Sequence, residues 1–386
     1  MQFVYRMPTE IQFGAGAIRD IGASIRRFGE RPFVVTGRGS ARENGALDQV
    51  LTAFPKALVF EGVDEDPETD QCDEAAAKCK AGGCDVVVAI GGGSPMDAAK
   101  AVAGLARNDG RCAEYIGRDT FTNGALPLVA VPTTAGSGSE VTPYAVLVDT
   151  ERREKATIGG ENLFPKAAVL DPELTRGMPR QVTVNSGLDA LSQCMEGIVS
   201  TKGTPKGDIL ALEGCRLVRR WLPEAANNGD NLEARTQMQF AAMLSGCVIA
   251  QSRTTLVHGM GYPLTVHFRV RHGLANALLL TPLFRHNAQY APDKVAAIAE
   301  ALGYPADPTP ESAAGRVAEA IHAMLKAVDV SPAAKDAGVD GARLDEFAAA
   351  LAASPHRFQT QIGEITEAKV RAMYEQAYQG SIHEPA

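Results

Sequence analysis

The chain has 386 residues, a length that favours two domains over one. Hydrophobic residues make up 45% of it and charged residues 22%, which is the composition of an ordinary globular protein. Its net charge of −8 argues against a nucleic acid or an anionic membrane as partner, because either would require a basic surface.

Apolar runs and cysteine usage bear on the cellular compartment of the protein. The first ten residues, MQFVYRMPTE, lack the apolar run of a signal peptide, and no stretch reaches the apolar length of a membrane span. The seven cysteines are odd in number and form no CxxC pair, which is typical of reduced thiols. We therefore expect a cytoplasmic protein without a disulfide framework or a zinc knuckle.

The first half of the chain alternates short β-branched runs with helical patterns such as TDQCDEAAAKCKAGG. This alternation predicts parallel strands joined by crossover helices, that is, an α/β domain with a doubly wound sheet. Polar DTERRE at the centre of the segment 142–159 predicts a hairpin. The strands predicted for the sheet are 31–37, 57–63, 84–93, 126–134 and the short strand 166–174.

After about residue 176 the strand signal disappears, and helical patterns follow one another to the end. We therefore predict an α/β dinucleotide-binding domain over 1–176 and an all-helical metal and substrate domain over 177–386. The predicted helices are 182–200, 207–222, 231–251, 254–265, 272–290, 293–302, 310–328, 334–338, 343–353 and 366–378.

The segment VVVAIGGGSPMDAAKAVA at 86–103 places three glycines between a buried strand and a helix. Glycines let the backbone approach a pyrophosphate, and a helix N-terminus offers free N–H groups to an anion. The segment is not the GxGxxG fingerprint, and its alternative interpretation is a plain strand-to-helix turn capped by Ser94. Three consecutive glycines exceed what a turn needs, so we favour phosphate binding. A second glycine-rich segment, VPTTAGSGSEVTP at 131–143, either contacts a nucleotide or substrate or forms a flexible loop.

Six motifs, in this order, together resemble the iron-containing (group III) alcohol dehydrogenases. They span residues 86 to 280, and the two-domain layout of that family covers the whole chain. The resemblance implies a dinucleotide-binding α/β domain, a helical metal-binding domain and an active site in the cleft between them. The motifs are GGGSPMDAAK, PTTAGSGSEVT, LDPEL, GLDALS, VHGM and HGLANALLL.

The resemblance places the coenzyme contacts in the first domain. It implies that Gly92, Gly93 and Ser94 hold the pyrophosphate, with Asp97 nearby. Lys155 occupies the place of a lysine that approaches the ribose and the nicotinamide, although its position alone favours a solvated residue beside a charged hairpin tip. The residues that would contact the nucleotide through their hydroxyl groups are Thr133, Thr134 and Ser137.

The end of the first predicted strand of the sheet bears on the choice of coenzyme. NAD-preferring relatives carry an aspartate there for the adenosine ribose hydroxyls, whereas this chain has Gly37, followed by Arg38, Gly39 and Ser40. The missing carboxylate removes a repulsion of the 2′-phosphate of NADP, which Arg38 and Ser40 can bind. The alternative is an exposed turn with an incidental arginine. We predict a preference for NADP(H) over NAD(H).

A metal site is implied in the helical domain. Asp189 and Gln193 lie four residues apart and so share a helix face, while His258 and His272 flank a loop. One carboxylate and two imidazoles suit Fe²⁺ or Zn²⁺. Relatives usually have a histidine where this chain has Gln193, a poorer ligand. The substitution of glutamine for this histidine leaves three possibilities: three protein ligands with water in the fourth position, weak ligation by the Gln193 amide oxygen, or loss of the metal. We expect the metal to be retained.

Tyr262 and His267 are the candidates for proton transfer. Tyr262 stands where relatives often have a histidine credited with proton relay, and a phenol is a poorer proton shuttle near neutral pH than an imidazole. His267, five residues on, either substitutes for that histidine or faces solvent or cofactor. Arg269 and Arg271 either anchor an anionic substrate or belong to a solvated loop or a subunit contact.

These features together predict reversible hydride transfer between a nicotinamide coenzyme and a small aldehyde or ketone, with the metal polarising the carbonyl oxygen. We expect an alcohol or aldehyde as the partner, anionic if the two arginines anchor it, and a homodimer or larger homo-oligomer. The alternatives are a metal-free enzyme like the maleylacetate reductases, a lyase or cyclase like dehydroquinate synthase, and a nucleotide-binding protein without catalysis.

Overall fold

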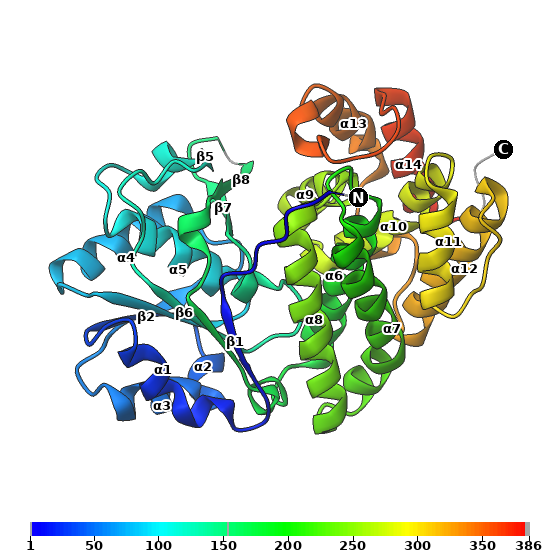
Figure 1. Ribbon diagram of the computed structural model, residues 1–386. Coiled ribbons are helices and arrows are strands. Elements are labelled where there is room, and N and C mark those ends of the chain that lie inside the picture. The colour runs from blue at the N-terminus through cyan, green and yellow to red at the C-terminus, as the bar shows by residue number, and fades with distance from the viewer. Residues whose placement is uncertain (1, 153, 383–386) are drawn as a thin grey trace. The chain divides into compact units, whose positions relative to one another are not determined.

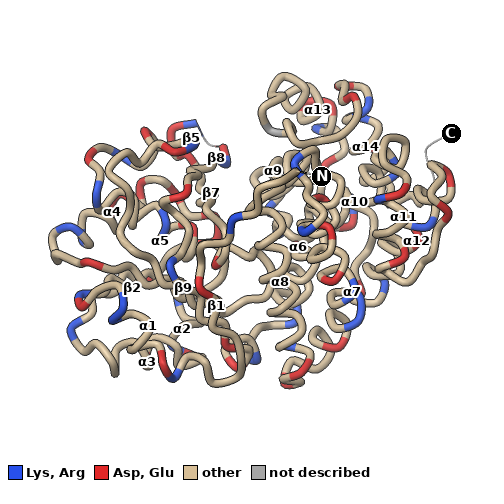
Figure 2. The backbone as a smooth tube through the Cα atoms, viewed as in Figure 1, with Lys and Arg blue, Asp and Glu red and all other residues tan. Residues whose placement is uncertain are grey.

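The computed structural model describes residues 2–152 and 154–382, which divide into two compact units. The α/β unit holds the described residues of 6–179 together with 229–239, and the helical unit holds 2–5, 180–228 and 240–382. Charged residues of both signs are scattered along the chain in each unit (Figure 2). Among the described residues, no single helix is both long enough and apolar enough to cross a membrane. The bent pair of helices Leu232–Ser252 and Leu256–Phe268 reaches that length and apolarity only when the two are counted together.

A six-stranded sheet forms the centre of the α/β unit, and all of its neighbouring strands are parallel (Figure 1). The strand order is β1-β9-β6-β4-β2-β3, which confirms the predicted α/β architecture with a parallel sheet. The strands are β1 (Glu10–Phe13), β2 (Pro32–Gly37), β3 (Leu58–Val63), β4 (Val86–Gly91), β6 (Leu128–Pro132) and β9 (Ala167–Leu170).

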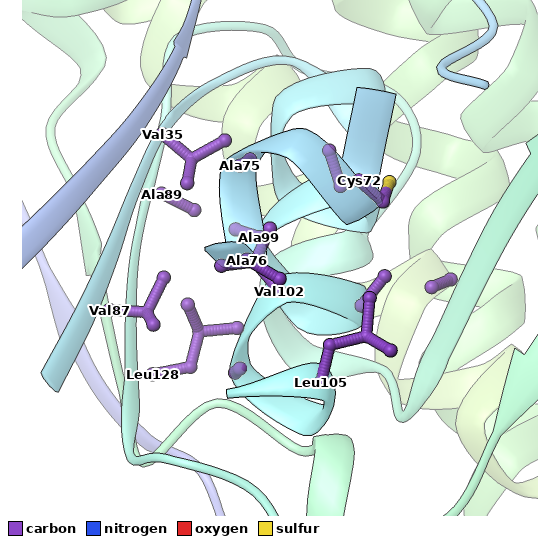
Figure 3. Packing of buried hydrophobic residues seen from close by; sticks show 14 of the residues in the cluster. Val35, Cys72, Ala75, Ala76, Val87, Ala89, Ala99, Val102, Leu105 and Leu128 are labelled. Atoms are coloured by element: carbon purple, nitrogen blue, oxygen red, sulfur yellow. The ribbon is translucent and has the colours of Figure 1, made fainter. Parts of the chain in front are cut away.

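Helices cover both faces of this sheet, so the central strands are apolar on both sides. Val87 and Ala89 of β4 pack against α4 and α5, where small residues such as Ala99 let the helix lie close to the sheet (Figure 3). The alternate residues Val88 and Ile90 pack on the opposite face with α1 and α3. The covering helices are α1 (Ile21–Arg26), α3 (Ala46–Ala53), α4 (Thr69–Ala81) and α5 (Gly93–Leu105).

A smaller sheet contains the predicted hairpin. Strands β7 (Tyr144–Asp149) and β8 (Glu154–Gly159) pair antiparallel, as expected for a hairpin with a polar tip. The two-residue strand β5 (Gly117–Arg118) adds to β8 in parallel and was not predicted. This sheet carries Lys155 of β8, one of the expected coenzyme contacts.

The second half of the chain is helical from Arg180 to Gln379, as predicted. The segment 334–338, predicted as a helix, is a short 3₁₀ helix over Ala334–Ala337, because Gly338 follows with a left-handed backbone of φ 84°. The α-helices are α6 (Arg180–Val199), α7 (Pro205–Asn227), α8 (Leu232–Ser252), α9 (Leu256–Phe268), α10 (His272–Ala288), α11 (Pro292–Ala301), α12 (Pro310–Ala327), α13 (Leu344–Ala352) and α14 (Glu367–Gln379).

Helix α10 packs against both α6 and α9, and this contact places the expected metal ligands together. Gly273 permits the close approach of α10 to α6, because a Cβ there would lie 1.8 Å from the carbonyl oxygen of Asn185. Any larger residue at this position would push the start of α10, and with it His272, away from Asp189.

Candidate functional site

Two loops meet at the carboxyl end of the sheet in the α/β unit. Gly93, at the start of α5, faces the loop after β6, since a Cβ on Gly93 would lie 3.1 Å from the Cβ of Ser137. A Cβ on Gly92 would lie 3.2 Å from Cγ2 of Thr134, and the backbone of Thr133 donates to the carbonyl oxygen of Gly91 at 2.9 Å. Side chains at the two glycines would crowd Thr134 and Ser137, so the glycines allow the two loops to lie this close together.

The first amides of α5 lie beside the place where the two loops meet. The N-cap residue is Gly92, so Ser94 lies in the first turn and does not cap the helix. Because Gly92 has no side chain, no capping side chain accepts a hydrogen bond from these amides, and they remain available to a phosphate.

Asp97 of α5 contacts the second glycine-rich loop, which follows β6, and the strand β7 after it. Its carboxylate accepts hydrogen bonds from Ser139 Oγ at 2.6 Å and from the Val146 amide at 3.0 Å. The buried Lys100 completes the network by donating to Ser139 Oγ at 2.5 Å and to the carbonyl oxygen of Tyr144 at 2.7 Å. Burial lowers the pKa of Lys100 to about 8. Asp97 and Lys100 therefore fix the position of the second glycine-rich loop through Ser139.

The side chain of Lys155 is shielded from solvent, which contradicts the interpretation as a solvated residue. Its side chain is 6% exposed, and its Nζ lies 2.6 Å from Oδ1 of Asp66. Asp66 itself adopts a left-handed backbone with φ 58°. The ion pair orients the lysine from β8 toward the loop that follows β3.

Arg38 and Ser40 follow β2, beside the loop of three glycines. A Cβ on Gly37 would lie 3.7 Å from the ring of Pro95, which places these two loops next to each other. Arg38 donates from Nε at 2.8 Å and from Nη2 at 2.5 Å to Oδ1 of Asp64, a residue directly after β3. The sequence prediction missed Asp64, although its place at the end of the neighbouring strand could have indicated it.

The expected metal ligands converge in the helical unit. Asp189 of α6, His258 of α9 and His272 of α10 offer donor atoms that all lie within 4.8 Å of one another. Asp189 Oδ1 lies 3.6 Å from Nε2 of His258 and 3.8 Å from Nε2 of His272. The His272 side chain is 30% exposed, against 7% for His258, so the group is reached from the His272 side. This donor set, one carboxylate and two imidazoles, fits Fe²⁺ or Zn²⁺.

Glu196 of α6 fixes the orientation of His258, and the sequence motifs did not predict this role. Its Oε2 is hydrogen-bonded to Nδ1 of His258, and its Oε1 accepts from the amide and the hydroxyl of Thr255, both at 2.8 Å. Although burial disfavours a charged imidazole, the carboxylates of Glu196 and Asp189 raise the pKa of His258 to about 10. The pocket therefore stabilises positive charge beside this ring.

Gln193 contacts Asp189 through its amide nitrogen. Its Nε2 donates to Asp189 Oδ2 at 3.0 Å, and its Oε1 accepts from Ser245 Oγ of α8 at 2.8 Å. The carboxylate determines this orientation of the amide, because a carboxylate only accepts hydrogen bonds. Positions 189, 193 and 196 share one face of α6, so one helix provides a ligand, its support and the carboxylate behind His258.

The two candidates for proton transfer lie in different surroundings. The Tyr262 ring stacks on His272, with centroids 5.6 Å apart and planes at 17°. The exposed His267 instead stacks on Phe347 of α13, with centroids 5.2 Å apart. The structure thus brings Tyr262 beside the three-ligand group. Arg271 is the N-cap of α10, directly before His272, and Arg269 is exposed with a left-handed φ of 57°.

Both units of the chain match models of one known protein family. Residues 8–172 match the family model described as iron-containing alcohol dehydrogenase, and residues 183–378 match the C-terminal model of the same family. The chain is 34% identical over 330 residues to the 1,3-propanediol dehydrogenase of Citrobacter freundii, covering 84% of this chain and 85% of that protein.

Solved structures give the same result. A crystal structure of 1,3-propanediol oxidoreductase matches with a TM-score of 0.92 and 31% identity, covering 98% of this chain and 100% of the other. A sulfoacetaldehyde reductase from Bifidobacterium kashiwanohense in complex with NAD⁺ matches with a TM-score of 0.86 and 30% identity, covering 98% and 99%.

Proposed function

The chain belongs to the iron-containing alcohol dehydrogenase family, and we propose that it is a metal-dependent enzyme working with NAD(P)(H). As a member of this family it is an oxidoreductase of alcohols or aldehydes. The nicotinamide coenzyme would supply or accept the hydride that interconverts a small alcohol and its aldehyde or ketone. The observation that carries this proposal is the convergence of Asp189, His258 and His272.

Each residue of the proposed site has a separate part in the reaction. Asp189, His258 and His272 would hold Fe²⁺ or Zn²⁺, which when bound polarises the carbonyl oxygen of the substrate. Glu196 accepts a hydrogen bond from His258 Nδ1, so Nε2 is the nitrogen that faces Asp189 and would bind the metal on loss of its proton. Tyr262, beside His272, would donate a proton to the former carbonyl oxygen, which becomes the hydroxyl of the alcohol, and would regain one from water. His267 is the second proposed proton relay, because an exposed imidazole exchanges protons with water.

The coenzyme would bind in the α/β unit. We propose that Gly92, Gly93 and Ser94 receive the pyrophosphate, since no side chain caps the amides at the start of α5. Thr133, Thr134, Ser137 and Lys155 would contact the nucleotide, and Asp97 would act through the loop it supports. The glycine at 37 and the guanidinium of Arg38 support a preference for NADP(H) over NAD(H). Asp64 holds this guanidinium through Nε and Nη2, and its carboxylate would compete with a 2′-phosphate for it.

Metal analysis together with a coenzyme assay tests this function. Protein purified without chelator should contain iron or zinc and reduce aldehydes with NADPH or NADH. EDTA should abolish that activity, Fe²⁺ or Zn²⁺ should restore it, and H258A should lack both metal and activity. Activity that survives complete metal removal would support a metal-free reductase instead, and coenzyme binding without turnover on any aldehyde would indicate a protein without catalysis.

An anionic substrate is favoured by the position of Arg271. It immediately precedes the proposed ligand His272, and a relative of known structure is named sulfoacetaldehyde reductase. A guanidinium there would pair with a carboxylate or sulfonate on the substrate. We expect R271A to raise the KM for sulfoacetaldehyde or succinic semialdehyde about 10-fold or more, the effect of about 1.4 kcal/mol, while leaving the KM for propanal unchanged. Equal effects on both substrates would contradict the idea.

We also propose a cytoplasmic location and a homodimer or larger homo-oligomer. The cysteines, all of which lie in the described part of the chain, are free thiols, and six of the seven are buried, which suits a reducing compartment. Sedimentation velocity of the purified protein would test the oligomeric state.

A further inference from the structure

Asn276 of α10 projects into the middle of the three-ligand group. Its Nδ2 lies 3.1 Å from Asp189 Oδ1, 3.3 Å from Nε2 of His258 and 3.2 Å from Nε2 of His272. These nearly equal distances place one end of the carboxamide over the centre of the triangle formed by the three donor atoms. A cation held by those atoms would therefore lie directly against Asn276.

The chemistry of an amide decides which end can face a cation. The NH₂ group carries only donors, whereas the carbonyl oxygen has two lone pairs. In this structure the NH₂ group donates to Asp189 Oδ1, but it would repel a bound metal ion. Turning the terminal torsion of Asn276 by half a turn exchanges the two ends, and this torsion is broad and roughly two-fold. The turned side chain would present Oδ1 to the metal.

The other end of the carboxamide has no hydrogen bond that resists this turn. Oδ1 of Asn276 is buried, and within the described residues nothing donates a hydrogen bond to it. It lies against Gly261 of α9, where a Cβ would come within 2.3 Å of it. A buried carbonyl oxygen without a donor is rare in proteins, and here it lies one torsion away from a group of metal ligands.

Gln193, by contrast, is not free to supply its oxygen. Its Oε1 accepts from Ser245 at 2.8 Å and its Nε2 donates to the outer oxygen of Asp189 at 3.0 Å. Ligation by Gln193 would break both hydrogen bonds and turn an amide nitrogen away from a carboxylate.

We propose that Asn276, through Oδ1, is the fourth protein ligand of the metal, and that Gln193 positions Asp189 without binding the metal. The resulting set has two oxygens, from Asp189 and Asn276, and two imidazole nitrogens, a combination compatible with Fe²⁺ or Zn²⁺. This inference rests on the proposed function, in that it requires the site to hold a metal.

Direct metal binding tests the inference independently of activity. Full-length protein freed of metal by chelator would be titrated with Zn²⁺ against a chromophoric competitor, and with Co²⁺ while its visible absorption is recorded. We expect N276A to bind Zn²⁺ about 10- to 100-fold more weakly than the wild type, at least the loss that follows removal of an outer-shell partner. The Co²⁺ spectrum of N276A should change as well, because a ligand is lost.

Two further variants keep the test decisive. N276D should bind Zn²⁺ at least as tightly as the wild type, because a carboxylate presents an oxygen in either orientation. N287A serves as the matched control: Asn287 is also a buried asparagine of α10, but it pairs with Gln361, and its loss should leave the Co²⁺ spectrum unchanged.

The possible failures are distinguishable. Wild-type protein that binds neither Zn²⁺ nor Co²⁺ would overturn the metal-dependent function and this inference with it. Normal binding by the wild type, with unchanged affinity and spectrum in N276A, would overturn the inference alone. A Co²⁺ spectrum changed in Q193A but not in N276A would assign the fourth position to Gln193.

Discussion

Glu196 and His258 share a buried hydrogen bond that fixes which ring nitrogen faces Asp189. We expect E196A to weaken Zn²⁺ binding about 10- to 100-fold, because carboxylates behind a ligating histidine contribute that much. E196Q should recover most of the affinity, since its amide oxygen can still accept from Nδ1. Competition titration with a chromophoric chelator measures both. If E196A bound Zn²⁺ like the wild type, Glu196 would have no part in positioning the ligand.

Glu140 provides a prediction about pH. It is buried in the α/β unit, and burial raises its pKa from an ordinary 4.5 to about 7. Its protonated form is therefore favoured in the folded state, and this contribution to stability is full below pH 4.5 and lost as the pH rises through 7. Glutamine is neutral throughout, so E140Q should gain stability relative to the wild type across this range, by roughly 3 kcal/mol at pH 8. Thermal unfolding of both proteins at pH 5 and pH 8 would show it; a pH-independent difference would contradict it.

Site residues that stand in sequence motifs were predictable from the sequence. Site residues whose role depends on the packing of helices were not. Asp189, His258 and His272 stand in recognisable motifs, and the structure brings them together. Glu196 and Asn276 occur on the same helices as the ligands, seven and four residues on, but only the packing of α6, α9 and α10 shows what they contact. Helical spacing could have indicated that they share a face with the ligands.

At the scale of elements, we propose that residues at the ends of β2 and β3 set the preference between NADP(H) and NAD(H). Asp64 after β3 holds Arg38 after β2, and its negative charge would repel a 2′-phosphate. We expect D64N to raise the ratio of kcat/KM for NADPH over NADH about 3- to 10-fold, the range set by about 1 kcal/mol for an exposed ion pair. Steady-state kinetics with both coenzymes on one aldehyde would measure it.

A matched pair on the same strands controls for this effect. Arg42 forms a similar two-bond ion pair with Glu61 of β3, at 2.6 and 3.0 Å. E61Q should leave the coenzyme ratio within about 2-fold of the wild type, since surface ion pairs contribute little in general. A ratio that moved equally in E61Q and D64N would mean that only overall charge matters, and an unmoved ratio in D64N would exclude Asp64 as a selective residue.

The strands and helices themselves were largely predictable, and the exceptions have physical causes. The buried strands β2, β4 and β6 are nearly continuous apolar runs rich in valine, the pattern of a sheet covered on both faces. Strand β1 has only four residues, none of them buried, so its pairing with β9 leaves no periodic signal. Elements that depend on a distant partner carry too little local pattern to be recognised alone.

At the scale of the whole molecule, the residues proposed to bind the metal and those proposed to bind the coenzyme lie in different units. The proposed metal ligands belong to the helical unit, and the proposed coenzyme contacts belong to the α/β unit. Each bound group should therefore stabilise the unit that contains its own contacts, because a ligand stabilises only the folded structure that binds it. This gives a test that does not depend on turnover.

Metal at 100 times its dissociation constant should stabilise the helical unit by about 2.7 kcal/mol. The single tryptophan, Trp221 of α7, reports on that unit by fluorescence during thermal unfolding. NADPH should instead protect the amides of β4 and α5 from hydrogen exchange. H258A should remove the effect of metal on Trp221 unfolding and retain the protection by NADPH. If H258A lost both effects, or if metal stabilised H258A as it does the wild type, the assignment of the metal to the helical unit through His258 would be wrong.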